Sequence, residues 1–207
     1  PMVIQREGNY HDLAADRENP SATAVRELML QSGNWLTYVP EAARDHLKNA
    51  PLHTLQAGER AVLAKLRTMT EAEFEAVPYG SEGLWRKLMH NARTLFTLEE
   101  ILSATKSKRY TRTRLDRMVM CAFLGLTEAD LATPAPYCRA LAFNDSGRKI
   151  LKTARKTGIF PNAGELVNHP YQELEYRAER LYSLFALDCA VPQLEENRRI
   201  VYKNTGK

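Results

Sequence analysis

Apolar residues recur at helical spacing along most of this chain, and this period limits the possible folds more than any other feature. The clearest case is the stretch 82–95, in which Leu84, Leu88, Ala92 and Leu95 fall within one quadrant of a helical wheel. A helix with one apolar stripe buries that stripe against other elements. The repeated pattern therefore predicts a mainly α, multi-helix protein.

Capping signals predict where individual helices begin and end. Asn19 is expected as an N-cap with Pro20 as the first helical residue, and Gly33 as the stop of that helix. Thr97 and Glu100 are expected to form a capping box. Further helices are predicted over residues 58–69, 70–77, 82–95, 97–105, 111–126, 147–157 and 171–187. Short strands are predicted over residues 1–6 and 137–143, the second followed by a turn.

Composition excludes several classes of protein. No stretch approaches the roughly eighteen consecutive apolar residues of a membrane span, so no membrane association is expected. Cys121, Cys138 and Cys189 are far apart and odd in number, which disfavours disulfides and a zinc site and favours reduced thiols in the cytoplasm. The net charge of +4 favours an anionic partner only weakly. The case for such a partner therefore depends on where the charges lie along the chain.

The predicted helix start at residues 21–26 is a candidate phosphate site. A helix amino terminus carries unpaired backbone N–H groups and about half a positive charge, which attract anions. The hydroxyls of Ser21 and Thr23 add donors, and Arg26 lies one turn further on. The alternative is that Ser21 and Thr23 only cap the helix and that Arg26 is solvated.

Upstream of this helix, the predicted first strand ends at Arg6 and is followed by a loop. Ligands of α/β nucleotide sites bind beyond the carboxyl ends of strands, so Arg6 is a candidate for contact with a base or a phosphate. His11 and Asp12 are interpreted as loop hydrogen-bonding residues, because no further carboxylate or histidine nearby in sequence completes an acid–base pair.

The densest positive charge lies in residues 106–117, across a loop and the first turns of a predicted helix. It comprises Lys106, Lys108, Arg109, Arg112, Arg114 and Arg117, against one acidic residue. Cations are unfavourable at a helix amino terminus, which indicates an anion that offsets them. Lys and Arg contacts with phosphate supply most nucleic-acid affinity, and Tyr110 is suited to stack on an unpaired base. The alternative is a solvated charged face.

Other features are weaker. Two predicted helices each have a basic face, which solvation explains as well as contact with nucleic acid does. One face comprises Arg86, His90 and Arg93, and the other comprises Arg148, Lys152 and Arg155. The five histidines are scattered without metal-ligand spacing, so no metal site is expected. No GxSxG, Walker A or GxGxxG motif occurs.

Several segments resemble the tRNA(Met) cytidine acetate ligase family. Residues 4–12 (IQREGNYHD) and 21–26 (SATAVR) resemble the end of its nucleotidyltransferase domain. Residues 81–84 (SEGL), 108–117 (KRYTRTRLDR) and 136–144 (PYCRALAFN) resemble its helical domain, in the same order. The KRYTRTR run beside the EGL and FN elements is the specific part, since many nucleotidyltransferases share the Ser-Thr-Arg signature.

The resemblance implies an architecture and a set of roles. Residues 1–32 would be the last strand and helix of a Rossmann-like, ATP-binding nucleotidyltransferase domain, and residues 33–207 a helical tRNA-binding domain with a short strand or hairpin. It implies an ATP-dependent ligase that activates acetate as acetyladenylate and acetylates N4 of the wobble cytidine of elongator tRNA(Met). The implied ATP contacts, with Mg²⁺ beside ATP, are Arg6, Glu7, Ser21, Thr23 and Arg26; the implied tRNA contacts are Lys106, Lys108, Arg109, Tyr110, Arg112, Arg114 and Arg117.

The family's amino-terminal half, with its HxGH motif and acetate pocket, is not among these 207 residues. We therefore expect the catalytic residues to lie outside this chain, and the chain to be inactive without that half as partner. Two rival hypotheses are a non-catalytic RNA-binding helical module and a helical interaction protein without a nucleic-acid role. The basic segment disfavours the second rival.

Overall fold

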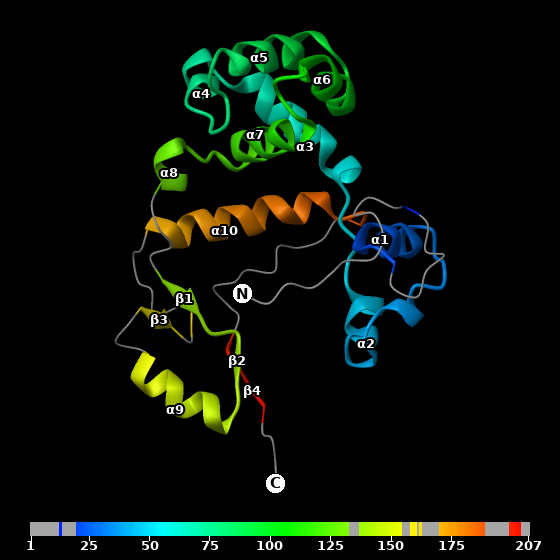
Figure 1. The fold of residues 1–207 in the computed structure, drawn as a ribbon, viewed down its shortest axis with the longest axis vertical. Coiled ribbons are helices and arrows are strands. Elements are labelled where there is room, and N and C mark those ends of the chain that lie inside the picture. The colour runs from blue at the N-terminus through cyan, green and yellow to red at the C-terminus, as the bar shows by residue number, and fades with distance from the viewer. Residues whose placement is uncertain are drawn as a thin grey trace. The chain divides into compact units, whose positions relative to one another are not determined.

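The computed structural model describes residues 13, 20–132, 137–154, 158–160, 162, 170–188 and 199–203. The chain divides into two compact units, Pro1–Leu52 and His53–Lys207 (Figure 1). Most described residues are helical, which confirms the predicted mainly α class. Among the described helices, none combines the length and the apolar character needed to cross a membrane. The strand predicted over residues 1–6 lies outside the described residues, and the functional boundary expected after residue 32 stays a prediction.

The described residues of the first unit form three short helical elements. They are α1 (Ala22–Leu30), the 3-10 helix η1 (Leu36–Tyr38) and α2 (Glu41–Asn49). The N-cap of α1 is Ser21, whose Oγ accepts the Ala24 N–H at 3.0 Å, so the prediction of Asn19 as N-cap was wrong. The extended backbone of Ser21 brings its hydroxyl onto the first turn, which leaves Pro20 outside the helix.

The second unit holds the hydrophobic core. Among its described residues, the helices are α3 (Leu55–Thr68), α4 (Glu71–Glu75), α5 (Leu84–Thr94), α6 (Leu98–Thr105), α7 (Arg112–Leu124), α8 (Glu128–Ala132), α9 (Asp145–Ala154), α10 (Pro170–Tyr182) and the 3-10 helix η4 (Ser183–Phe185). Helices α3 to α7 pack together in one bundle (Figure 1). The fully buried side chains at its centre include Val62, Leu66, Phe74, Leu84, Leu88, Ile101, Leu102, Leu115 and Met118.

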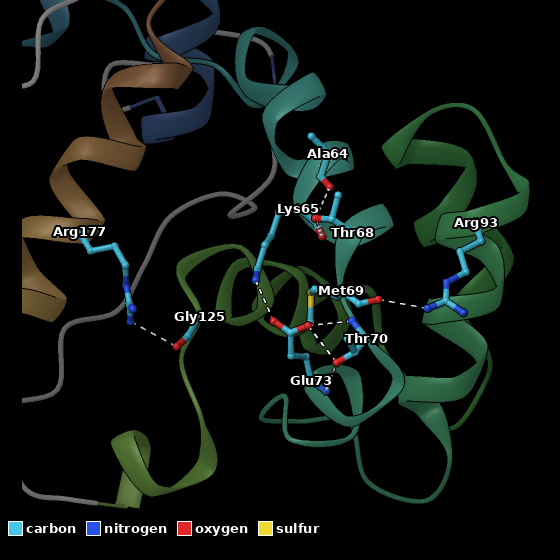
Figure 2. Close-up of polar contacts among 9 residues, drawn as sticks. All are labelled: Ala64, Lys65, Thr68, Met69, Thr70, Glu73, Arg93, Gly125 and Arg177. Carbon is cyan, nitrogen blue, oxygen red and sulfur yellow. Dashed lines mark hydrogen bonds and ion pairs between the residues drawn. The ribbon is translucent and has the colours of Figure 1, made fainter.

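Local capping sets most helix ends in this bundle. Thr97 and Glu100 form the predicted capping box, and Thr70 and Glu73 form a second one at the start of α4 (Figure 2). Helix α5 begins at Leu84 because the two residues before it have left-handed backbone.

The end of α10 is attached to α3 through η4. The Thr54 N–H donates to the Phe185 carbonyl at 2.8 Å, and the Phe185 ring lies over Gly58 of α3. A Cβ atom built on Gly58 would lie 2.4 Å from Phe185 Cδ1, so only glycine allows this approach.

The strands of the second unit are two residues long and pair in parallel. β1 (Cys138–Arg139) pairs with β3 (Ile159–Phe160), and β2 (Ala142–Phe143) pairs with β4 (Val201–Tyr202). The predicted strand over residues 137–143 is thus interrupted, and the alternative of a hairpin is wrong for these pairs because their partners lie far along the chain. Helix α9 starts within the predicted turn, where Asn144 Oδ1 accepts the Gly147 N–H at 2.9 Å.

Candidate RNA-binding surface at the start of α7

The basic segment 106–117 spans the α6–α7 turn and the first turns of α7, as predicted. Ser107 and Tyr110 exchange backbone hydrogen bonds across the turn, at 3.3 and 3.2 Å. Thr111 is the N-cap of α7, and its hydroxyl accepts the Arg114 N–H. The turn therefore presents its side chains from a fixed backbone.

Three cations of this segment project into solvent. Lys106, Lys108 and Arg117 are exposed, and within the described part of the chain their side chains form no hydrogen bond or ion pair. An exposed cation without a carboxylate partner keeps its full charge for an incoming anion. These three side chains match the predicted role best.

Arg109 and Tyr110 both contact one carboxylate from a distant loop. Arg109 Nη2 donates to Glu82 Oε1 at 2.6 Å, and the Tyr110 hydroxyl donates to Glu82 Oε2 at 3.1 Å. The Arg109 side chain is still 69% exposed, and exposed pairs of this kind contribute only about 0–1 kcal/mol. The Glu82 pair therefore leaves Arg109 open to further contacts.

Arg112 is bound within the bundle instead. It donates to both oxygens of Glu99 on α6 at 2.7 Å and to Asp116 Oδ1 at 2.8 Å. The Arg112 hydrogen bonds, with a smaller contribution from Ser103, lower the pKa of Glu99 to about 2, and the same carboxylates raise the pKa of Arg112. Arg112 thus ties α6 to α7.

Arg114 is also occupied by protein groups. Its Nε donates to the Tyr79 carbonyl at 2.9 Å and its Nη2 to Ser81 Oγ at 2.8 Å. Its guanidinium lies 5.1 Å from the centre of the Tyr110 ring, which also packs against the hydrophobic core. The ring is in contact with its own protein, and its predicted stacking on a base stays a prediction.

The structure thus divides the seven predicted residues into two groups. Lys106, Lys108, Arg109 and Arg117 point charge toward solvent, whereas Arg112, Arg114 and Tyr110 mainly bind other parts of the bundle. Glu99, which binds Arg112, and the Tyr79 carbonyl, which binds Arg114, lie 13 and 35 residues away in sequence, so the linear pattern did not show this division. Glu82 belongs to the site although no sequence pattern predicted a role for it; it lies within the SEGL segment that resembles the family.

Basic residues elsewhere in the second unit bind the carboxyl ends of helices. The contacts are Arg67 with the Leu95 carbonyl, Lys87 with Thr105, Arg93 with Met69 and Arg177 with Gly125, at 3.0 to 3.3 Å. Figure 2 shows the Arg93 and Arg177 contacts. Cations in these positions bond carbonyls that lack a helical partner and complement the helix dipole. These four cations therefore have a structural role.

The two weaker basic faces are partly engaged as well. Arg86 lies over the Trp85 ring at 4.8 Å, and Arg148 lies over the Tyr202 ring at 5.6 Å. Lys152 is exposed, while Arg155 lies outside the described residues.

The predicted ATP contacts are only partly described. Arg6 and Glu7 lie outside the described residues. Ser21 is buried as the cap of α1, Thr23 is half-buried in the first turn, and Arg26 is exposed. The capping interpretation of Ser21 is confirmed, and a contact of this helix start with phosphate stays a prediction. Among the described residues, no three His, Cys, Asp or Glu side chains lie close enough together to hold a metal ion.

Comparison with known proteins places the chain in a family. The HIGH Nucleotidyl Transferase family model matches residues 1–197. The tRNA(Met) cytidine acetate ligase of Alkaliphilus metalliredigens is 29% identical over 95% of this chain and 52% of its own length. The enzyme of the same name from Clostridium novyi is 31% identical over 78% of this chain and 43% of its own length. The chain thus spans about half the length of these relatives.

Two solved structures show the same fold. Apo Thermotoga maritima TmcAL superposes with a TM-score of 0.79 and 22% identity over 96% of this chain and 54% of that chain. The same protein bound with alpha-thio ATP gives a TM-score of 0.74 and 23% identity over 91% of this chain and 53% of that chain. The match along nearly the whole sequence confirms the predicted kinship with the tRNA(Met) cytidine acetate ligases, and the chain therefore belongs to the HIGH nucleotidyl transferase family.

Proposed function

We propose that this chain is part of a tRNA-modifying ligase, to which it contributes tRNA binding and part of an ATP site. In the complete reaction, ATP activates acetate as acetyladenylate with release of pyrophosphate. The acetyl group then passes to N4 of the wobble cytidine of elongator tRNA(Met). The names of the relatives and the alpha-thio ATP in the Thermotoga protein support this proposal.

The observation that carries the tRNA role is the exposed charge at the α6–α7 turn. Lys106, Lys108 and Arg117 have no described side-chain partner, and Arg109 is largely exposed. Each cation that neutralises a phosphate releases counterions, which changes the slope of log K against log salt by about −0.7 to −0.9. Four such contacts suffice for strongly salt-dependent binding of an RNA backbone.

The proposed ATP role uses the start of α1. The first N–H groups of a helix have no intrahelical acceptor, and Arg26 is exposed one turn further on. Adenylation builds negative charge at the α-phosphate and on departing pyrophosphate, which N–H donors and an arginine stabilise. Ser21, Thr23 and Arg26, with Arg6 and Glu7, would form one wall of the site. The remaining walls, and the acetate pocket, would come from the nucleotidyltransferase half.

Binding of tRNA by the chain alone is the direct test. Arg117→Ala should weaken binding of elongator tRNA(Met) and make the salt slope less negative by about one. Arg60→Ala is the matched control, because Arg60 is an exposed arginine of α3 without a described partner. Equal effects of the two substitutions would contradict the assignment of the α6–α7 turn.

The catalytic part requires the second half. Co-production of an HxGH-bearing nucleotidyltransferase half should yield acetylation of tRNA(Met) that depends on ATP and acetate, and Arg6→Ala should abolish it. If tRNA binds but Arg6→Ala leaves acetylation unchanged, the ATP assignment is wrong.

The alternative of a non-catalytic RNA-binding module is favoured by one observation. Ser21 serves as an ordinary cap of α1, so this helix start has a structural reason for its hydroxyl. This alternative predicts tRNA binding without any acetylation after co-production.

A further inference from the structure

The loop 79–83 carries an unusual concentration of left-handed backbone. Tyr79 and Glu82 have φ angles of 68° and 61°, and Gly83 has 80°. Among the described residues, only Ser32 is a further non-glycine residue with positive φ. Side chains crowd the backbone in this conformation, so a non-glycine residue adopts it only where surrounding contacts enforce it.

The loop has backbone hydrogen bonds of its own, and the basic segment adds side-chain contacts to it. Arg114 donates to the Tyr79 carbonyl and to Ser81 Oγ, and Glu82 accepts from Arg109 and Tyr110. The loop and the segment are therefore one hydrogen-bonded unit, although they lie about 30 residues apart in sequence.

Glu82 is the informative member of this unit. Glycine would adopt its backbone conformation at less cost, so the carboxylate itself has to account for a glutamate at this position. Of the Arg109 guanidinium, Glu82 binds Nη2 alone, and the other guanidinium donors form no hydrogen bond among the described residues. The Arg109 side chain remains 69% exposed while one end is held.

We propose that Glu82 is a positioning residue for RNA binding, which holds the Arg109 guanidinium so that its remaining donors face a backbone phosphate of the RNA. This inference rests on the proposed tRNA-binding function and adds a residue to it. A long cationic side chain loses rotamer freedom when it binds phosphate, and a carboxylate that fixes it beforehand reduces that loss. The expected effect of the carboxylate is roughly two- to tenfold in affinity.

The sign of the effect separates positioning from simple charge. If the carboxylate acts only through its charge, it repels the phosphate, and its removal strengthens RNA binding. Removal of a positioning carboxylate weakens it. The test compares dissociation constants for elongator tRNA(Met) at several salt concentrations.

The main variant is Glu82→Gly, because glycine tolerates the left-handed backbone and the fold should be kept. Glu82→Ala is the second variant, and thermal unfolding checks both. The matched control is Glu75→Ala, an exposed carboxylate of α4 without a described partner. We expect Glu82→Gly to weaken binding two- to tenfold with a less negative salt slope, and the control to leave binding unchanged or slightly tighter.

The double variant with Arg109→Ala completes the test. If Glu82 acts through Arg109, Glu82→Gly has no further effect once Arg109 is replaced. The positioning role is overturned if Glu82→Gly binds tRNA as tightly as the unaltered chain. It is also overturned if Glu82→Gly weakens binding equally with Arg109 present and with Arg109 replaced. Either result leaves the tRNA-binding function intact. Failure of the unaltered chain to bind tRNA overturns that function and this inference with it.

Discussion

Arg112→Met distinguishes a structural arginine from an RNA contact within the same basic segment. The substitution keeps an unbranched apolar stem but removes the guanidinium and its hydrogen bonds to Glu99 and Asp116. Partly exposed pairs contribute about 0.2–1 kcal/mol each, and the bidentate pair with Glu99 lies near the upper end. A cation in the first turn of α7 interacts unfavourably with the helix dipole, so its removal stabilises the fold by about 0.3–1 kcal/mol.

The net expectation is a loss of about 0.5–1 kcal/mol in the free energy of unfolding, or about 1–4 °C in Tm. Binding of tRNA should keep its salt slope, because the Arg112 donors already bind carboxylates. Lys108→Met is the control with the opposite expectation. It should leave Tm unchanged and make the slope of log K against log salt less negative by about one. A stable Arg112→Met variant with a reduced slope would refute the division of the segment into structural and RNA-binding cations.

Three further predictions concern stability. Gly58→Ala should lower the free energy of unfolding in denaturant by about 1–3 kcal/mol, since its Cβ would overlap the Phe185 ring; no loss would mean that the ring moves freely. The pKa of Glu99 is lowered from 4.5 to about 2, so its stabilisation is complete above about pH 4.5 and is lost as the pH falls toward 2. Between pH 4.5 and pH 2 the free energy of unfolding should therefore fall more steeply for the unaltered chain than for Arg112→Met. Parallel curves of this free energy against pH would contradict a stabilising Arg112–Glu99 pair. Thr97→Ala should cost about 1 kcal/mol and lower Tm, because the first turn of α6 loses its cap; an unchanged Tm would show that packing alone holds that turn.

Local sequence signals predicted the bundle well where caps and apolar spacing agree. The Thr97–Glu100 box and the buried stripe of Leu84, Leu88 and Ala92 lie as expected. Helix α2 was not predicted, and none of its residues is buried in the structure. The parallel strand pairs escaped prediction for another reason: each two-residue strand depends on a partner far along the chain, which no local pattern identifies.

The candidate site shows the same limit. The run of charge located the α6–α7 turn, since charge density is a property of neighbouring residues. It did not show that Arg112 and Arg114 bind the bundle, nor that Glu82 meets Arg109.

The sequence by itself determined the helical class, most helix ends in the bundle and the position of the basic turn, because caps and side-chain spacing act within three or four residues. Only the tertiary structure decided which cations face solvent and which are neutralised. An ion pair depends on distance in space, and Glu82 and Glu99, which bind Arg109 and Arg112, come from another loop and another helix.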